Sequence, residues 1–502
     1  MKTVLCKKGY ILDKAQFDAK VIMETKAELN VRPHVVNFFN ANQEAEPFPV
    51  FIENSKKISV PKYYGLSKFG QPELIVENEG VTVDVPFKGE LRDYQIPIVA
   101  KIVAVLRGSG GGVLPLGCGK GKTTIGLKVF SEMKKKGLIL VHKEFLVNQW
   151  IERIKQFLPT ARIGKLQQNT VDTVDKDIVI GMLQSISMKT YDNSIFDEFG
   201  FVCVDECHHI SSKVFSQALP KVATKYMLGL SATPEREDKL EKVLYWYMGP
   251  LIFELENQFN MKTIVKTYKY SCNHDKFKEV ISHITHKPNV TKMVTNLSEI
   301  PERNSFLVSL INSTIASEPT RKCLILSSRV EHLKQLKKSF DDDKKYTTGL
   351  YIGKMKKDAL KASESKDIIF ASYQLAEEGL DIPALDTVLY ATPRKKIKQS
   401  KGRIERKKEH EYINAPLILD IADKIRTFTN QSYVRSTEYR KCKYDIDIYD
   451  VENNIITHVK KIVADKSGCI KNTTTKNAGG GEDGAFIDDD DDDKEGAFID
   501  DD

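Results

Sequence analysis

The chain has 502 residues, of which 41% are hydrophobic, and a formal net charge of +7. At roughly 150 residues per domain, this length predicts two or three folded domains. The sequence has no run of about 18 apolar residues and no apolar stretch of the signal-peptide type at its N-terminus. We therefore expect no membrane contact and a soluble intracellular protein, in the cytoplasm or nucleus, or in a virion if its source is a virus.

The eight cysteines are scattered and form no CxxC pair, which predicts reduced thiols in a reducing compartment. Cys203, Cys207, His208 and His209 lie close together in the sequence, and metal coordination is one interpretation of that cluster. Cys203, however, lies inside an apolar run, where a free cysteine is usually a small buried hydrophobe. We favour the structural interpretation.

The net charge conceals a division between the body of the chain and its end. Residues 482–502 contain twelve acidic side chains and Lys494, a charge of −11, so residues 1–481 carry +18. A body that basic favours a polyanionic partner, DNA or RNA, although a solvated lysine-rich surface is the alternative. The tail, 476–502, repeats the letters GAFIDDD and is predicted to be disordered. It either solubilises the protein or docks on a partner through its spaced apolar pairs.

The order of the elements predicts an α/β fold. Residues 1–85 read as a small accessory domain, in which the basic and aromatic stretch 56–64 indicates either a half-buried edge strand or a nucleic-acid contact. From about residue 90, short apolar runs alternate with helical patterns, as in parallel sheets covered by helices on both faces. The expected units are a first domain at 86–255, a less regular connector and the start of the second domain at 256–300, a second domain at 301–430 and an extension at 431–475.

Within these units the expected elements take the following ranges. The first domain is predicted to contain helices at 94–106 and 145–158 and strands at 113–116, 138–141, 177–180, 201–204 and 226–230. The second is predicted to contain strands at 323–327, 367–371, 387–391 and 417–420 and helices at 330–340 and 399–408.

A glycine-rich loop between a strand and a helix carries the strongest local signal. Successive backbone amides of such a loop surround phosphate oxygens, Lys122 neutralises their charge, and Thr123 offers a hydroxyl to Mg²⁺. The longer phosphate-loop pattern has glycine where Leu116 stands, and a merely glycine-rich connection is the alternative. The predicted ATP-binding residues here are Leu116, Gly117, Cys118, Gly119, Lys120, Gly121, Lys122, Thr123 and Thr124.

Two acids follow the apolar strand that ends near residue 204. If this strand ends beside the phosphate loop, Asp205 is placed to hold Mg²⁺ and Glu206 is placed to act as the base for the attacking water. An exposed strand end with ordinary acids is the alternative, but the combination of loop and acids disfavours it.

The tetrad Asp205-Glu206-Cys207-His208 resembles the DExH box of superfamily 2 helicases. Further segments between about 90 and 425 resemble that family's other motifs in their usual order. The resemblance implies two tandem RecA-like domains, with Gln95 reading adenine and with Mg²⁺ and ATP as cofactors. It assigns coupling to His208, Ser231, Ala232 and Thr233, nucleotide contacts to Gly379 and Asp381, and catalytic roles to Gln399, Arg403 and Arg406.

The expected activity is an ATP-dependent DNA or RNA helicase or translocase. Gln149-Trp150 and the residues after the SATP segment look most like repair and transcript-release DNA helicases, including those of large DNA viruses. Two other classes stay open, the motor subunit of a nuclease complex and an ATP-binding scaffold without unwinding. In a helicase, arginines from the second domain would complete the hydrolytic site when the domains close on ATP.

Overall fold

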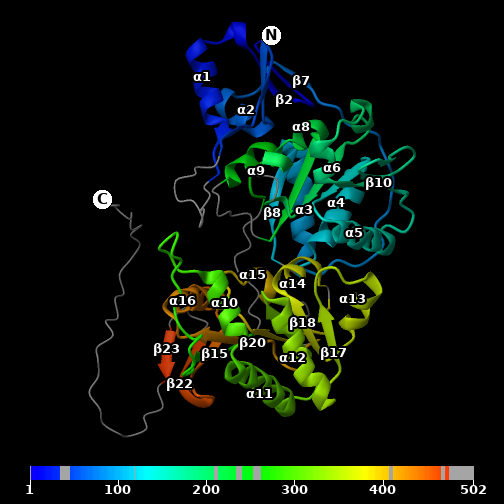
Figure 1. The fold of residues 1–502 in the computed structure, drawn as a ribbon. Helices are drawn as coiled ribbons and strands as arrows, with labels where there is room; N and C mark the ends of the chain where they lie inside the picture. Colours follow the sequence, from blue (N-terminus) through cyan, green and yellow to red (C-terminus); the bar gives the residue numbers. More distant parts are fainter. Residues whose placement is uncertain are drawn as a thin grey trace.

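The structure is a computed structural model that describes residues 2–33, 46–117, 119–208, 213–232, 240–252, 262–380, 382–405, 411–464 and 470–473. Three sheet-containing units follow one another along the molecule in sequence order, from the N-terminal unit at the top of Figure 1 to the last at the bottom. Among the described helices, none combines the length and the apolar character needed to span a membrane.

The N-terminal unit is built on a five-stranded sheet in the order β5-β6-β2-β1-β7. Its strands are β1 (Thr3–Cys6), β2 (Gly9–Asp13), β5 (Ile52–Glu53), β6 (Lys57–Val60) and β7 (Leu74–Val76), and its helices are α1 (Ala19–Glu28) and α2 (Lys62–Phe69). The prediction of an edge strand at 56–64 is wrong, because β6 pairs with strands on both sides and Tyr63 and Tyr64 belong to α2. Alternation along β6 buries Ile58 and Val60.

The first α/β unit has a seven-stranded sheet in the order β11-β10-β12-β9-β13-β14-β8, parallel except for β11. Its strands are β8 (Gly111–Pro115), β9 (Gly137–Val141), β10 (Ile163–Gln167), β11 (Thr170–Asp172), β12 (Ile178–Met182), β13 (Phe201–Asp205) and β14 (Tyr226–Ser231). Every residue of β9, β12 and β13 is buried, which explains their continuous apolar runs.

Helices cover both faces of this sheet. One core contains side chains of α3 (Gln95–Ser109), α4 (Lys122–Met133) and α5 (Glu144–Phe157). The opposite core contains side chains of α6 (Leu183–Met188), α8 (Leu219–Val222) and α9 (Glu241–Met248). The N-terminal unit docks on α9, where the rings of Tyr64 and Trp246 meet edge to face with centroids 5.3 Å apart.

The second α/β unit has a nine-stranded sheet in the order β17-β18-β16-β19-β20-β15-β21-β22-β23. Its strands are β15 (Ile264–Ser271), β16 (Cys323–Ser327), β17 (Thr348–Tyr351), β18 (Ile368–Ser372), β19 (Thr387–Tyr390), β20 (Leu417–Asp423), β21 (Asp445–Glu452), β22 (Ile455–Ala464) and β23 (Ile470–Thr473). Its helices are α10 (Val290–Ser298), α11 (Pro301–Ser317), α12 (Val330–Asp343), α13 (Lys357–Glu364), α14 (Tyr373–Gly379), α15 (Lys398–Lys401) and α16 (Arg426–Lys441).

Two predicted elements of this unit need correction. The stretch 256–300, predicted as a connector and the start of the second domain, contains a strand that was not predicted, since β15 lies inside the sheet between β20 and β21. Its lysines alternate with the buried Val265, Tyr268 and Tyr270, so it lacks the continuous apolar run that marks the other strands. Of the helix expected at 399–408, the described residues form only α15, which ends at the cap residue Gly402, and residues 406–408 lie outside the described residues.

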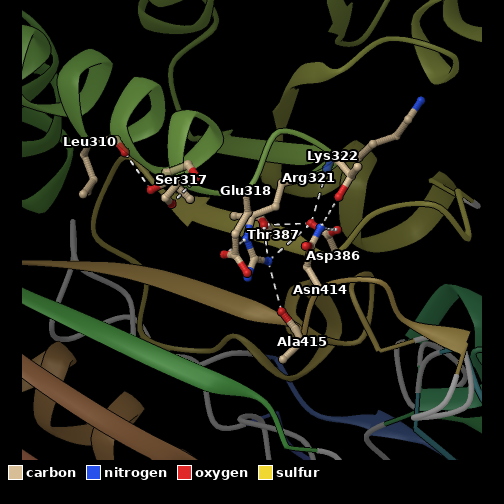
Figure 2. Close-up of polar contacts among 11 residues, drawn as sticks. Leu310, Ser317, Glu318, Arg321, Lys322, Asp386, Thr387, Asn414 and Ala415 are labelled. Carbon is tan, nitrogen blue, oxygen red and sulfur yellow. Dashed lines mark hydrogen bonds and ion pairs between the residues drawn. The ribbon is translucent and has the colours of Figure 1, made fainter.

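Charged residues inside the second unit hold helices and strands together. Arg303 of α11 binds both carboxylate oxygens of Asp423 at 2.7 and 2.9 Å, and Arg435 of α16 binds Asp420. At the amino ends of the strands, the buried Arg321 contacts Glu318, Thr387 and the Ala415 carbonyl (Figure 2). That edge is therefore occupied by a structural polar network, and in open parallel sheets it is the carboxyl edge at which ligands bind.

Candidate active site

The carboxyl ends of three parallel strands bring the predicted groups of the first unit together. Asp205 at the end of β13 pairs in register with Leu230 of β14, and Ser231 at the end of β14 pairs with Pro115 of β8. Residues 116–121 follow β8, and Glu206 follows β13. The glycine-rich loop and the two acids, 83 or more residues apart in the sequence, thus share one edge of the sheet.

The loop turns sharply at two glycines before α4 begins at Lys122. Gly119 and Gly121 have φ values of +75° and +78°, a conformation that favours glycine. A Cβ at Gly121 would also meet the side-chain Nε2 of Gln95, so a larger residue there would have to displace that side chain. Leu116, which departs from the longer pattern, is fully buried in the core, so it precedes the exposed part of the loop.

Gln95, the first residue of α3, is hydrogen-bonded to the glycine-rich loop. Its Nε2 donates to the Lys120 carbonyl at 3.0 Å, and its Oε1 accepts from the Arg92 amide at 3.0 Å. The Tyr94 hydroxyl donates to the same Lys120 carbonyl at 2.9 Å. The predicted adenine-reading glutamine therefore uses its donor to hold the loop and its acceptor to hold the segment before α3, a role that the sequence did not reveal.

Asp205 is a buried carboxylate held by the protein. Its Oδ2 accepts from Trp150 Nε1 at 2.9 Å, and its Oδ1 accepts from the Glu206 amide at 3.0 Å. Burial, reinforced by the neighbouring Glu206 carboxylate, raises the pKa of Asp205 to about 6. Trp150 lies on the buried face of α5, as its spacing predicts, but its bond to Asp205 was missed, because the two residues are 55 positions apart.

Glu206 lies at the centre of the positive charges of the site. Lys122 Nζ is 3.3 Å from its Oε1, and its φ of +47° is uncommon for a residue with a side chain. Burial alone would raise the pKa of Glu206, but Lys122, His208 and Arg403 together lower it. The side chain is therefore held as a carboxylate at neutral pH.

A histidine joins the two neighbouring strand ends. His208 Nδ1 lies 3.1 Å from the Ser231 hydroxyl and 3.5 Å from Glu206 Oε2. The predicted coupling residues His208 and Ser231 are thus in contact, and Ala232 follows them directly. A second histidine of the site, His142 after β9, was not predicted. Burial lowers the pKa of His142 to about 4, and the charges of Glu206 and His208 also affect this pKa.

The second unit contributes Arg403. Its guanidinium donates to the Leu380 carbonyl at 2.7 Å, which ties the segment after α15 to the end of α14, where Gly379 lies. Arg403 also acts on the pKa of Glu206, across the boundary between the two sheets. Similarly, burial lowers the pKa of Lys120, and Glu405 of the second unit opposes that shift. Charged groups of both units therefore face each other here.

Several predicted positions cannot be placed. Cys118, Thr233, Asp381 and Arg406 lie outside the described residues, as does His209, and Gln399 is described in its backbone only. Cys203 and Cys207 are buried in opposite cores of the first sheet, and burial raises the pKa of both thiols. These two sulfurs pack the interior.

The residues present fit ATP and Mg²⁺. A loop of turned backbone ending at a helix N-terminus, together with Lys122, suits a chain of phosphates. The Thr123 hydroxyl and the Asp205 carboxylate are hard oxygen donors of the kind that Mg²⁺ prefers. Lys122 lies close enough to affect the pKa of Asp205, so these donors and the loop belong to one site.

Comparison with known proteins supports this assignment. A family model described as "Type III restriction enzyme, res subunit" matches residues 88–236. A protein of Acanthamoeba polyphaga mimivirus, provisionally named an ATP-dependent RNA helicase, is 37% identical over 464 residues, which cover 91% of this chain and 88% of that protein. A DNA 3'-5' translocase of Sulfurisphaera tokodaii is 32% identical over 235 residues, 43% of this chain and 49% of that protein.

Among solved structures, a fragment of an HsdR subunit of a type I restriction enzyme from Vibrio vulnificus has a TM-score of 0.51 at 16% identity. The match covers 74% of this chain and 70% of that one, and it shows the fold alone. The fold and the site define a nucleoside triphosphatase built on two tandem RecA-like domains, which confirms the predicted fold class.

With the similarity to the mimivirus protein extending over most of both chains, the protein belongs to the superfamily 2 helicases. It is an ATP-dependent nucleic-acid helicase or translocase that uses ATP and Mg²⁺. The alternatives of a nuclease motor subunit and a non-catalytic scaffold are not favoured, because the relative that matches over most of its length is named a helicase.

Proposed function

We propose that closure of the two RecA-like domains on ATP assembles the hydrolytic site and that this closure moves the protein along a DNA or RNA strand. The observation that carries the proposal is the position of Arg403. It is anchored in the second domain at the Leu380 carbonyl, yet it acts on the carboxylate of Glu206 in the first. Separation of the domains would remove its charge from the site.

The proposed roles follow from the geometry. The loop amides and Lys122 bind the phosphates, and Gln95 keeps the loop in its turned conformation. Asp205, oriented by Trp150, and Thr123 hold Mg²⁺, which when bound neutralises phosphate charge. Gly379, Asp381, Gln399 and Arg406 are assigned to the second domain's side of the site by their positions in the sequence motifs.

Glu206 is proposed to accept the proton of the attacking water. Its depressed pKa keeps it ionised, and Lys122 binds its Oε1, while its Oε2 is buried without a hydrogen bond, 3.5 Å from His208 Nδ1. The His208 contact to Ser231 gives the proposed coupling route, because a shift of Glu206 on hydrolysis would reach the end of β14 through that histidine.

Glu206→Gln is expected to keep ATP binding and to lower turnover by about 10²-fold or more, since glutamine retains the shape but cannot take a proton. ATP affinity from calorimetry and turnover from phosphate release measure the two effects. The matched control is Glu331→Gln on α12, whose side chain is 83% exposed, and its turnover should equal that of the wild type. Near-normal turnover by Glu206→Gln would remove the base assignment.

Movement along a strand can be tested by displacement of streptavidin from a biotin at one end of a single strand. We expect ATP-dependent displacement from one end only, in a DNA arm, an RNA arm or both, because translocation has a polarity set by how the two domains grip the backbone. The relatives are named for both kinds of nucleic acid, so the two arms identify the track. Absence of displacement in both arms would contradict translocation.

The acidic tail, which lies outside the described residues, is proposed to compete with nucleic acid for the basic body. Its −11 charge is tethered to a body of +18, so its effective concentration there is high. Truncation after Gly481 is expected to tighten strand binding at low salt. The effect should shrink as the Debye length falls from about 30 Å at 0.01 M to about 8 Å at 0.15 M salt.

Fluorescence anisotropy at both salt concentrations measures this effect. Identical binding curves for the full chain and the truncated chain would contradict the competition. They would favour the alternatives that the tail only keeps the protein soluble or that Phe486 and Phe498 dock it on a transcription or repair protein.

A further inference from the structure

The connection between β15 and α10 contains a short, well-defined hairpin, residues 280–289, which we call the pin. Ile281 and Pro288 form an antiparallel bridge, and Asn289 donates to the Val280 carbonyl at 2.7 Å. At the tip, the Ser282 hydroxyl accepts from the amides of Ile284 and Thr285 at 3.3 Å each. The pin is therefore a fixed backbone structure rather than an irregular loop.

The base of the pin is anchored in the second domain. Phe277 and Val280 pack against a buried cluster that includes Leu297 of α10 and Phe428 of α16. Glu279 accepts a hydrogen bond from Thr427 at the start of α16. These contacts tie the pin to two helices, so a force on its tip is transmitted to the domain as a whole.

The tip is apolar and its sides are basic. Ile284 is 85% exposed and Ile281 is 48% exposed. Lys278, two residues before the pin, and Lys287 within it are exposed and form no ion pair with any other residue that the structure describes. His283 and His286, also exposed, flank Ile284 on both sides. An isoleucine tip flanked by one lysine within the hairpin and another just before it matches a partner with negative charge and flat apolar faces.

The pin lies on the functional edge of the second sheet. β15 is parallel to β20, which is parallel to β19, and β16 joins β19 to β18 in the same direction. The chain therefore leaves β15 at the same edge as the segments after β18 and β19, which lead to Gly379 and Arg403. In Figure 1 the green connection that leads to α10 rises beside that helix, above α16.

We propose that the pin contacts the nucleic-acid strand directly, with Ile284 against a base and Lys278 and Lys287 beside the backbone phosphates. Apolar side chains of this kind insert between base steps and unstack them, and lysines neutralise phosphates. The pin is fixed to the second domain. Each closure of the two domains would therefore move the tip of the pin along a nucleic-acid strand that the first domain holds. The inference rests on the helicase activity and not on the roles proposed for the ATP-site residues.

Photocrosslinking tests the contact. A photoreactive benzoyl-phenylalanine replaces Ile284 in the full chain, and the same replacement at Val174, a 74% exposed position after β11 in the first domain, is the matched control. We expect Ile284 to crosslink to a labelled single strand, and excess unlabelled strand to prevent it, while Val174 does not crosslink. Equal crosslinking at both positions would overturn the proposal. So would the absence of crosslinking at position 284 to a strand whose binding by the wild type has been measured by fluorescence anisotropy.

A functional test separates the pin from the motor. Ile284→Asp is expected to lower the unwinding of a tailed duplex by about tenfold while strand-stimulated ATP hydrolysis stays within about twofold of the wild type. Val174→Asp is the control, and an unchanged melting temperature shows that both variants fold. Unwinding equal to that of the wild type would overturn the proposal. A wild type without strand-stimulated hydrolysis would instead contradict the helicase function itself.

Discussion

Lys122→Ala is expected to lower ATP turnover by about 10³-fold, because it removes the positive charge that faces the phosphate oxygens as negative charge develops. The structure gives a second reason. Lys122 Nζ lies 3.3 Å from Glu206, so its loss also removes the first of the cations that lower the pKa of this buried carboxylate. Glu206 would then be less fully ionised, and this loss of the base would lower turnover further, in addition to the weaker binding of the phosphates.

Lys128→Ala provides the matched control for this substitution. Lys128 lies on the same helix but pairs at its surface with Glu132, and its turnover should stay within about twofold of the wild type. ATP hydrolysis, ATP affinity and the melting temperature are measured for both variants. Turnover by a folded Lys122→Ala protein above a tenth of the wild-type value would contradict the assignment of the loop as the phosphate site.

Arg403→Ala is expected to lower turnover by about 10³-fold or more with little loss of ATP affinity, because a guanidinium from the opposing domain acts on charge that appears in the transition state. Arg403→Lys should recover only part of the rate, since lysine keeps the charge and loses the planar fork that also reaches the Leu380 carbonyl. The informative comparison is therefore between the turnover number and the dissociation constant of ATP.

Arg440→Ala on the exposed side of α16 is the control for Arg403 and should behave as the wild type. Arg403 is itself buried, so the melting temperature of each variant is needed to separate lost catalysis from lost folding. If Arg403→Ala weakened ATP binding as much as it slowed turnover, Arg403 would be a ground-state ligand, and the domain-closure account would lose its main support.

Much of the first domain could be predicted from the sequence because its signals are local. The buried strands β9 and β13 are continuous apolar runs, two acids stand where β13 ends, and the glycine-rich loop follows the apolar strand β8. The parallel arrangement then requires the loop and Asp205 to meet at one edge. The assignment of Leu116 shows the limit of pattern matching, since the structure places this residue in the core before the loop turns.

The contacts that orient the site could not be predicted in this way. The bonds from Trp150 to Asp205 and from Gln95 to Lys120 join residues that are far apart in the sequence, and no local pattern specifies either pair. β15 was missed for a different reason. Its lysines interrupt the apolar periodicity, and the strand is identified only by its pairing with β20 and β21.

The measurement that tests the central claim most directly is ATP hydrolysis by the full chain with Mg²⁺, compared without nucleic acid and with single-stranded DNA, duplex DNA and RNA. The account predicts that at least one of these raises turnover by about tenfold or more, that the concentration needed rises with salt, and that chelation of Mg²⁺ abolishes hydrolysis. Hydrolysis at the same rate with and without all three nucleic acids would contradict it.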